Sequence, residues 1–415
     1  MDQDQKRENK KKILFVINTL GRAGAETALM ALIGKLLGGE NKGKYDISIF
    51  VITGQGEMIE DLPSGVRVLN KEYHNSSVLS AGGRKLLKKT CIRALIRRCN
   101  FLRLFPYMLT NALSMRGGIK ADKLLWRVLS DGAVRFDERF DLAVAYLEGG
   151  STYYVSDHVT ADRKAAFVHV DYGQAGYTPK LDRGCYENMD RIFTVSDEVK
   201  DSFLGIYPSY SDKTEVFNNI IDSDRIRSMS KKEKGFEDGF DGIRIVTVGR
   251  LTAQKSFEVS VDAMKSITKK CAETGKHIRW YVFGEGDQRQ FLEKHIKECG
   301  LENDFILYGA VDNPYPFIDQ ADIYVHATRF EGKSIAIQEA QVLGKAIIAS
   351  DCSGNREQID DGRDGILCDF NAGSIADSVM RLLEDRELLE RLAASAPGKI
   401  NDSSRQIEKL TGLIG

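Results

Sequence analysis

The chain has 415 residues, of which 42% are apolar and 29% charged, and its formal net charge is -1. This length is too great for one ordinary hydrophobic core and suits two α/β domains of about 200 residues each. The balanced charge excludes the globally basic surface of a general nucleic-acid-binding protein, so we expect no nucleic-acid partner. The seven cysteines are scattered without a C-x-x-C pair, which argues against a disulfide framework and a zinc site.

The N-terminal sequence MDQDQKRENKKK is charged and leads directly into the apolar run KILFVI. It lacks the apolar stretch and small-residue cleavage site of a signal peptide. No window approaches the run of about 18 apolar residues that a membrane-spanning helix needs. The sequence therefore predicts a cytoplasmic protein without a transmembrane helix.

The first half of the chain alternates short apolar runs with helical patterns. After the first run comes a glycine-bearing turn and then AETALMALIGKLL, whose apolar residues recur at helical spacing. Apolar runs without strict alternation suit parallel strands that are covered on both faces. The predicted strands are residues 13–18, 46–53, 66–69, 141–147, 164–170, 191–196 and 214–218.

The same pattern restarts after a polar stretch at residues 230–242, which has the composition of a linker. The strands predicted there are 243–249, 278–284, 304–309, 322–327, 345–350 and 365–369. Strands alternating with helices in both halves predict two parallel, doubly wound sheets, whose ligands bind beyond the carboxyl ends of the strands. We expect an N-terminal domain at 1–229, a C-terminal domain at 230–396, and a final segment, 397–415, that returns to the first domain as a helix.

One segment departs from the even charge balance. Residues 84–103 contain eight basic residues and no acidic ones, interleaved with leucine, isoleucine and phenylalanine. A basic amphipathic helix fits this pattern. The spacing serves a solvated helix face over a buried stripe as well as it serves a contact with a membrane surface, so both interpretations stay open.

A candidate phosphate site follows the first strand of the second half. The turn runs from Gly249 and Arg250 to Lys255 and precedes the helical run SFEVSVDAMKSI. Backbone N–H groups and the helix dipole at such a turn attract anions. An arginine grips two phosphate oxygens at once, and a lysine adds a mobile point charge.

A second candidate set begins where the run DIYVHA ends. Glu331 precedes the helical run IAIQEAQVLG, and Glu339 lies a little over two turns along it, so both can face one cleft. A buried carboxylate that accepts two hydroxyl hydrogen bonds is one way to hold a ribose or hexose diol. Gly332 allows the backbone to approach a phosphate closely, beside Lys333 and Ser334.

The same stretch supports an alternative, because residues 327–334 are one substitution from the phosphate-binding loop G-x-x-x-x-G-K-[ST]. A P-loop NTPase would use Lys333 as its phosphate lysine. Glu331 would then set a carboxylate inside the phosphate nest, and Arg250 and Lys255 would have no role. A nicotinamide dehydrogenase is disfavoured, because neither Gly21 to Glu26 nor Gly284 to Gly286 completes the dinucleotide fingerprint.

The first domain offers weaker candidates. Gly21, Gly24 and Glu26 lie between a strand and a helix, where a Rossmann unit meets its ligand. His169 ends the run KAAFVHV, where a histidine can donate to a sugar hydroxyl. Asp222-Ser223-Asp224 has the D-x-D pattern of some metal sites, but a helix cap explains it better.

Taken together and in order, these motifs resemble the family 4 retaining glycosyltransferases, which have the GT-B fold of two facing Rossmann-like domains with a central cleft. The resemblance runs from KILFVINTLGRAGAE to GRDGILC and covers nearly the whole chain. Gly249, Arg250, Gln254 and Lys255 match the family's glycine-arginine and glutamine-lysine loop. Glu331 to Glu339 matches its E-x7-E signature, and Gly284 also lies where the family has glycine.

The resemblance implies roles for these residues. Arg250 and Lys255 would bind the donor diphosphate, Glu339 the ribose hydroxyls and Glu331 the donor sugar. His169 would lie near the reacting sugar, and Gly21, Gly24 and Glu26 would form the acceptor-side loop. Two positions depart from the family: Ser256 stands where glycine is usual, and Lys333 where an aromatic or small residue is common.

The sequence thus predicts a hexosyltransferase that uses a nucleoside-diphosphate sugar and needs no metal or cofactor. The expected acceptor is a sugar or a lipid-linked sugar in bacterial-type surface polysaccharide or glycoconjugate synthesis, with retention of anomeric configuration. Contact with the inner membrane face through residues 84–103 is part of this hypothesis. A P-loop NTPase and a non-catalytic nucleotide-sugar-binding module remain as alternatives.

Overall fold

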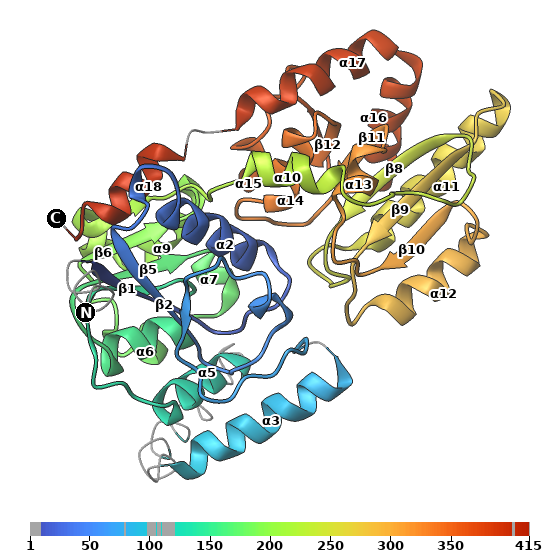
Figure 1. The fold of residues 1–415 in the computed structure, drawn as a ribbon. Helices are drawn as coiled ribbons and strands as arrows, with labels where there is room; N and C mark the ends of the chain where they lie inside the picture. Colours follow the sequence, from blue (N-terminus) through green and yellow to red (C-terminus); the bar gives the residue numbers. More distant parts are fainter. Residues whose placement is uncertain are drawn as a thin grey trace. The chain divides into compact units, whose positions relative to one another are not determined.

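The structure is a computed structural model that describes residues 10–78, 80–97, 105, 109, 121–400 and 403–414. The chain forms two compact units. The first unit comprises Met1–Ile220 together with Asp402–Gly415, and the second comprises Ile221–Asn401. Each unit is built on its own parallel sheet with helices on both faces (Figure 1). This arrangement confirms the predicted fold class of two Rossmann-like units.

The sheet of the first unit has the strand order β3-β2-β1-β4-β5-β6-β7. All neighbouring strands are parallel, and β1 pairs with both β2 and β4. The chain therefore reverses its direction of travel across the sheet between β1 and β4, which makes a topological switch point. The strands are β1 (Lys11–Ile17), β2 (Tyr45–Val51), β3 (Arg67–Val68), β4 (Arg139–Ala145), β5 (Thr160–Val168), β6 (Arg191–Thr194) and β7 (Thr214–Val216).

Two apolar cores cover the faces of this sheet because successive side chains of each strand point to opposite sides. In β1, Leu14 and Val16 pack into one core, whereas Ile13, Phe15 and Ile17 pack into the other. The described helices of this unit are α2 (Gly24–Leu37), α3 (Ala81–Ile96), α5 (Ala121–Gly132), α6 (Gly150–His158), α7 (Tyr172–Ala175), α8 (Pro179–Asp182), α9 (Asp197–Ile206) and α18 (Ser404–Thr411), with 3-10 turns at Gly39–Asn41, Glu57–Ile59 and Pro208–Lys213.

The last helix of the chain belongs to the first unit. Helix α18 contacts α2, and Leu410 and Ile414 are buried in the same core as Phe15 (Figure 1). The side chain of Gln406 accepts a hydrogen bond of 3.2 Å from the backbone N–H of Asn218. The C-terminal segment therefore completes one face of the first sheet.

The sheet of the second unit has the order β10-β9-β8-β11-β12-β13. Its neighbours are also parallel, and β11 pairs with β8 through Ile323 opposite Ile245. The switch point lies between β8 and β11, since the chain leaves β8 in one direction and returns to its other side at β11. The strands are β8 (Ile243–Val248), β9 (Ile278–Phe283), β10 (Phe305–Gly309), β11 (Ile323–His326), β12 (Ala346–Ser350) and β13 (Ile366–Cys368).

Helices cover both faces of this second sheet too. Val261 and Met264 of α11 pack into one core with Trp280 of β9, whereas Ile337 of α14 packs on the other side with Tyr281. The helices are α10 (Ser223–Ser230), α11 (Phe257–Glu273), α12 (Arg289–Cys299), α13 (Tyr315–Asp319), α14 (Ile335–Val342), α15 (Ser353–Arg356), α16 (Ala372–Glu384) and α17 (Arg386–Ser395), followed by a 3-10 turn at Ala396–Lys399.

The division between the units falls at residue 220, earlier than the sequence suggested with its boundary near residue 230. Helix α10 contacts α13 and α14, and Asn313 donates a hydrogen bond of 3.0 Å to the carbonyl of Met229. Phe236, within the polar stretch, packs against Tyr281 at 4.4 Å between ring centroids. Residues 221–242 are thus packed on the second unit and do not form a free linker.

Part of the basic segment lies in α3, whereas residues 98–103 lie outside the described part of the chain. Cys91 and Ala94 are buried, and α3 packs on α5. A Cβ at Gly132 of α5 would lie 2.5 Å from Ala94, so the glycine allows the two helices to cross closely. Ile92 and Ile96 are 58% and 69% exposed on the outer side of α3.

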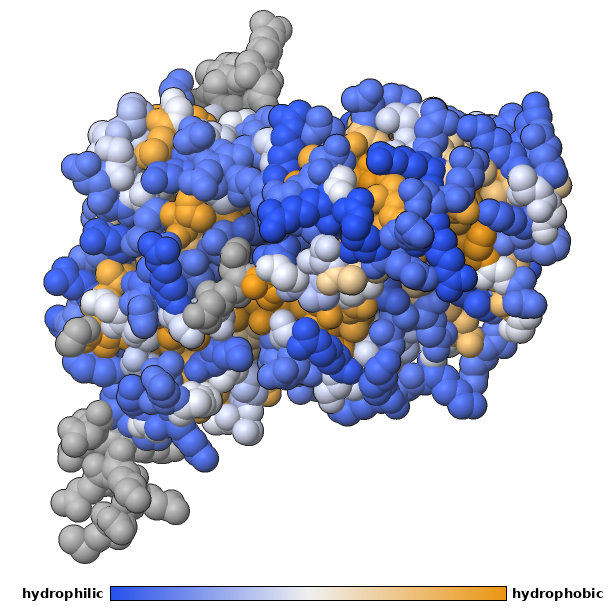
Figure 2. Space-filling model, turned by 90° about the horizontal axis from the view of Figure 1, so that it is seen from above, coloured by the Kyte–Doolittle hydropathy of each residue, from blue (hydrophilic) through white to orange (hydrophobic). Residues whose placement is uncertain are grey.

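Apolar side chains gather in several separate patches on the face of the molecule that Figure 2 shows, with hydrophilic residues between them. Such dispersed apolar surface is normal for a folded protein. Among the described residues, no helix combines the length and the apolar character needed to cross a membrane.

Candidate functional site

The main candidate site lies at the carboxyl ends of β8 and β11, the two central strands of the second sheet. These strands are neighbours, yet the chain makes a crossover through β9 and β10 before it reaches β11. In open α/β sheets ligands bind beyond the carboxyl ends of the strands at such a switch point. The loop after β8 carries Gly249, Arg250 and Lys255, and the loop after β11 carries Glu331, so topology brings the two sequence motifs to one edge.

Lys255 and Glu331 meet directly at this edge. The Lys255 ammonium donates a hydrogen bond to Glu331 Oε2, and only 15% and 18% of the two side chains are exposed. His326, the last residue of β11, is 2% exposed, and its Nε2 lies 3.1 Å from Lys255 Nζ and 3.3 Å from Glu331 Oε2. The structure therefore joins a predicted cation and a predicted acid, and it adds a histidine that the motifs did not single out.

The pKa values of this cluster follow from burial and charge. Burial alone would raise the pKa of Glu331, but the positive charge of Lys255 and the nearby imidazole of His326 outweigh it and hold the pKa at about 2. Burial, and then the charge of Lys255, lowers the pKa of His326 to about 4. At neutral pH the cluster thus holds an ionised Glu331 beside an uncharged His326.

Two glycines let the loops at the ends of β8 and β9 lie against each other. Gly284 has a φ of +155°, and a Cβ there would lie 2.0 Å from the carbonyl oxygen of Gly249. A Cβ at Gly286 would likewise lie 2.0 Å from the carbonyl oxygen of Leu251. Side chains at these positions would push the loop that carries Lys255 out of place.

The loops after β8 and β11 are also tied together by hydrogen bonds. Gln254 Nε2 donates to the Phe330 carbonyl at 2.9 Å, and the Gln254 carbonyl accepts from the backbone N–H of Arg329 at 3.2 Å. Ser256, where the sequence departs from the family's glycine, has a φ of +44°. This left-handed conformation explains why glycine is suited to the position. Ser256 remains there with a hydrogen bond of 2.6 Å to the Ala253 carbonyl.

The loop between β11 and α14 passes close to α15. A Cβ at Gly354 would lie 1.7 Å from the carbonyl oxygen of Gly332, so glycine is required at this crossing. Ser334 is the N-cap residue of α14 and makes no side-chain capping bond there. Lys333 is partly exposed in the same loop. Because α14 follows β11, the helix begins at the carboxyl edge of the sheet. Its first N–H groups favour negative charge there.

Glu339 lies inside α14 and is 7% exposed. Tyr315, at the start of α13, donates its hydroxyl hydrogen to Glu339 Oε1 at 2.8 Å. Burial raises the pKa of Glu339 to about 7, and the tyrosine bond only partly offsets this effect. In the described residues no hydrogen bond or ion pair links Glu339 to Lys255 or Glu331, so the structure places the two acids in one unit without joining them.

Arg250 stands apart from this cluster, although it belongs to the same loop as Lys255. Its side chain is exposed, and it makes no hydrogen bond or ion pair with any residue of the described part of the chain. An exposed guanidinium without a protein partner keeps all its donors for another anion.

The first unit has its own cluster at the carboxyl ends of β1, β4 and β5. Asn18 donates to the carbonyl of Glu148 at 3.0 Å, and the backbone N–H of His169 donates to Glu148 Oε2 at 3.0 Å. Neither ring nitrogen of His169 is accessible or hydrogen-bonded within the described residues, and burial lowers its pKa to about 3. The imidazole packs against Tyr146 at 5.1 Å between ring centroids. His169 thus occupies the predicted edge as an uncharged ring.

The predicted acceptor-side loop is at the same edge. Gly24 begins α2, and Glu26 in its first turn is 6% exposed. Gly21 has ordinary room for a Cβ, whereas a Cβ at Gly56 would lie 2.2 Å from the backbone of Leu20. The close approach that shapes this loop therefore involves Gly56, a position that the turn motif alone did not indicate.

The D-x-D pattern is structural, as the sequence suggested. Asp222 is the N-cap of α10, and its carboxylate accepts a hydrogen bond of 3.0 Å from the backbone N–H of Arg225. Within the described residues, the group of side chains that could hold a metal ion is Asp262, His295 and Cys299, on α11 and α12. That group shares no residue with the candidate site.

The second unit also matches a known protein family. Residues 230–399 match the family model described as Glycosyl transferases group 1. The matched segment contains the Lys255–Glu331 pair, His326 and Glu339.

Among curated proteins, the chain is 31% identical over 155 residues to the alpha-D-kanosaminyltransferase of Streptomyces kanamyceticus, which covers 37% of this chain and 39% of that one. It is 29% identical over 240 residues to an N-acetylgalactosaminyltransferase of Campylobacter jejuni named for a diphospho-undecaprenol substrate, with coverage of 57% and 59%. The chain thus spans less than two thirds of these relatives.

Among solved structures, the chain is similar to HepE from Anabaena in complex with UDP. The TM-score is 0.62 at 15% identity, and the match covers 97% of this chain and 98% of HepE. This similarity shows that the two Rossmann-like units make a GT-B fold.

The sequence alone did not indicate three residues of these clusters. They are His326 and Tyr315, the partner of Glu339, in the second unit, and Glu148, beside His169, in the first. Each has a partner that is distant in sequence, 71 positions away in the case of His326 and Lys255. A signal was present, since His326 is a polar residue inside the otherwise apolar run DIYVHA.

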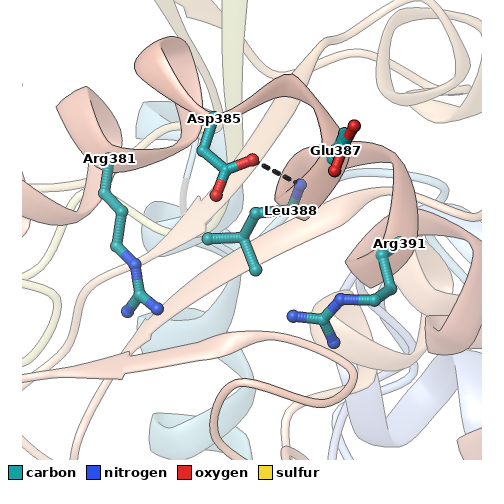
Figure 3. A pocket seen from close by; sticks show the side chains of 5 residues that line it. All are labelled: Arg381, Asp385, Glu387, Leu388 and Arg391. Carbon is teal, nitrogen blue, oxygen red and sulfur yellow. Dashed lines mark hydrogen bonds between the residues drawn. The ribbon is translucent and has the colours of Figure 1, made fainter.

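Two pockets lie away from the switch point of the second unit. One, of about 270 Å³, lies where α16 meets α17, and Figure 3 shows Arg381 and Arg391 on either side of Asp385 and Leu388. Asp385 caps α17 there by accepting a hydrogen bond from the Leu388 N–H. The other, of about 370 Å³, lies in the first unit between α3, α5 and the end of β2, and Lys71, Arg93 and Arg97 are among its lining residues.

Proposed function

We propose that this chain is a glycosyltransferase that moves a hexose from a nucleoside-diphosphate sugar to a sugar or lipid-linked sugar acceptor. The observation that carries the proposal is the Lys255–Glu331 pair at the switch point of a Rossmann-like sheet, inside the segment that matches the group 1 family. HepE, which has the same fold, is described in complexes with UDP and with UDP-glucose. These complexes support a nucleotide sugar as the ligand class.

The proposed donor site begins with the diphosphate. Lys255 and the exposed guanidinium of Arg250 are on one loop, and the start of α14 adds N–H groups and a helix dipole. When the glycosidic bond breaks, negative charge grows on the departing nucleoside diphosphate. Positive groups fixed near that charge stabilise the transition state more than the ground state, and loss of one such group from comparable sites costs on the order of 10²-fold in rate.

In this proposal, the two acids Glu339 and Glu331 bind the hydroxyl groups of the donor. Glu339 accepts hydrogen bonds from the ribose, with Tyr315 as its protein partner. Glu331 contacts the transferred sugar, and its low pKa keeps it an acceptor at neutral pH. The remaining donor contacts come from the loops that carry Gly249, Gly284 and Gly332, where the absence of a side chain lets a ligand approach the backbone closely.

The acceptor belongs to the first unit in this proposal. Gly21 lies in the loop after β1, Gly24 and Glu26 begin α2, and His169 lies at the same edge of the sheet as a buried, uncharged imidazole. The lipid-linked class draws support from α3, whose exposed Ile92 and Ile96 lie among basic residues. The proposal therefore includes a peripheral position on an anionic inner membrane face, which that surface supports.

The proposed transfer proceeds with retention of anomeric configuration and without a metal ion, since Arg250 and Lys255 supply the positive charge that a metal would otherwise provide. The products serve surface polysaccharide or glycoconjugate synthesis. A similar protein from Campylobacter jejuni is named for transfer to a diphospho-undecaprenol-linked sugar, which supports a role in glycoconjugate synthesis.

A thermal-shift panel of nucleotide sugars tests the proposal. A ligand at 100 times its dissociation constant stabilises the folded state by about 2.7 kcal/mol, so one nucleotide sugar should raise the unfolding midpoint. Lys255→Ala should abolish that rise, whereas Lys269→Ala, which removes an exposed lysine of α11, should preserve it. A panel in which no nucleotide sugar raises the midpoint of the wild-type chain contradicts the proposal.

Two further variants separate the alternatives. Lys333→Ala would abolish a P-loop NTPase, but it should only modulate transfer if Lys333 lies at the margin of the diphosphate. Glu331→Ala should bind the donor and lose transfer, because Glu331 acts on the sugar. Loss of donor binding alone, with unchanged turnover at saturating donor, would favour a role for Glu331 in binding only.

A further inference from the structure

His326 makes no contact with the donor in the proposed function. His326 ends β11, is 2% exposed, and stacks on Tyr324 of the same strand with an angle of 13° between the rings. Lys255 faces it from the loop after β8 and Glu331 from the loop before α14. Among the described residues, Lys255 and Glu331 are the charged groups that act on the pKa of the imidazole. Burial raises the pKa of Tyr324, which therefore stays a neutral phenol.

Only one nitrogen of the His326 ring meets these groups. Nε2 lies 3.1 Å from Lys255 Nζ and 3.3 Å from Glu331 Oε2. Nδ1 is inaccessible and makes no hydrogen bond within the described part of the chain. Any exchange of partners by His326 must therefore take place at Nε2.

In the structure Lys255 determines whether Nε2 of His326 donates or accepts a hydrogen bond. A lysine ammonium has hydrogen-bond donors and no acceptor, so Nε2 accepts from it and the ring proton resides on Nδ1. A protonated imidazole beside Lys255 would place two positive charges side by side. Burial and this charge hold the pKa of His326 near 4, whereas Glu331 acts in the opposite direction.

A ligand diphosphate changes this balance if Lys255 turns toward it. Glu331 would then lose its cationic partner while only 18% of its side chain is exposed. A carboxylate that is buried without a partner is strongly destabilising. The nearest group that can replace the lost cation is His326, since its Nε2 already lies 3.3 Å from Glu331 Oε2.

We propose that His326 is a positioning residue that takes over Glu331 when a diphosphate draws Lys255 away: Nε2 accepts a proton from solvent and donates it in a hydrogen bond to the Glu331 carboxylate. The proton comes from water or buffer, and no covalent bond other than N–H is formed. The inference rests on the proposed function, because Lys255 must leave for an anionic ligand. Its consequence is that Glu331 stays ionised and oriented toward the sugar in the loaded enzyme.

Isothermal titration calorimetry of the full-length chain tests this exchange. The titrant is the nucleotide sugar that gives the largest thermal shift, at pH 6 in two buffers with different ionisation enthalpies. Both phosphates of such a donor are diesters, which stay ionised at this pH, so the ligand contributes no proton change. On donor binding, the wild-type protein should take up more protons than His326→Gln does. The difference should be a fraction of a proton, with a maximum of about one.

The glutamine variant is the matched control. Its amide N–H can donate to Glu331 without titrating, so binding should stay within about threefold of wild type while the extra proton uptake disappears. His326→Leu leaves Glu331 without a donor and should weaken binding about tenfold, the equivalent of about 1.4 kcal/mol. Glu339 also titrates near this pH, but it is present in all three proteins and cancels in the comparison. Equal proton uptake by wild type and His326→Gln overturns the inference.

A second measurement uses the wild-type chain alone and does not depend on the folding of a variant. Imidazole nitrogen chemical shifts of the six histidines at pH 6 should show one ring whose Nε2 becomes protonated when the donor is added. No change in any histidine, in a protein that binds the donor, contradicts the inference and leaves the proposed function standing. Absence of binding by every nucleotide sugar contradicts the proposed function and the inference with it.

Discussion

Glu339 is a carboxyl group buried in α14 with the hydroxyl of Tyr315 as its hydrogen-bond partner. Burial raises its pKa from 4.5 to about 7. The folded state therefore binds a proton at Glu339 between these values, whereas the unfolded state does not. Because stability falls with rising pH where the folded state binds more protons, Glu339 should cost stability as the pH rises from about 4.5 to about 7.

The Glu339→Gln variant should lack this loss. A shift of about two and a half pKa units corresponds to roughly 3 kcal/mol as an upper limit. Urea unfolding of the ligand-free protein at pH 4.5 and pH 8 should show the wild type losing more stability than the variant across this interval. Glu302→Gln, which changes an exposed glutamate of the same unit, should behave as the wild type. Equal pH dependence for wild type and Glu339→Gln would contradict an ionisable, buried Glu339.

The sequence singled out Lys255 and Glu331 as candidate site residues, because each belongs to a short motif that follows an apolar run. It could not pair Lys255 with His326, because the two residues are 71 positions apart in the chain and meet only when the loop after β8 lies beside the end of β11. Ser256 illustrates the reverse case. The sequence marked it as a departure from glycine, and its φ of +44° shows the backbone conformation that glycine adopts more easily.

Helix α3 presents a mixed basic and apolar face. Lys85, Lys89, Ile92 and Ile96 are spaced by three or four residues and are exposed, so they share one side of the helix. Cys91 and Ala94 face the interior against α5. The structure therefore shows a basic face with exposed apolar residues, which combines the two surface chemistries that favour an anionic membrane.

Flotation with vesicles of anionic phospholipid tests this face. We expect the chain to float with anionic vesicles and to stay in solution with neutral ones. The triple variant K85Q/K88Q/K89Q should lose flotation, since each lysine near an anionic surface contributes about 1 kcal/mol. A variant with three exposed lysines of the second unit changed instead, K265Q/K269Q/K297Q, should float like the wild type. Flotation that survives loss of the α3 lysines would leave the solvated-face interpretation.

The strands themselves were predictable as elements. Every apolar run that the sequence assigned as a strand overlaps an observed one, because parallel strands covered on both faces are apolar along their whole length. The boundary near residue 220 was not predictable in the same way. Helix α10 is short and polar, and only its packing on α13 and α14 assigns it to the second unit.

For the whole molecule, both units have the strand order of a Rossmann-like sheet, with one switch point each. The sequence predicted two such sheets from alternation alone, and the similarity to HepE confirms the GT-B fold. The group 1 match lies in the second unit, which holds Lys255, Glu331 and Glu339. The candidate acceptor residues lie in the first unit, so the proposed reaction divides its two substrates between two separately built switch points.

The most direct test is an experimental structure of the full-length chain with the nucleotide sugar that the thermal-shift panel selects. The proposal predicts Lys255 and Arg250 within hydrogen-bond distance of the diphosphate, Glu339 on the ribose hydroxyls and Glu331 on the transferred sugar. A donor bound at another place, or bound at the switch point of the second unit with Lys255 still held only by Glu331, would contradict the central claim.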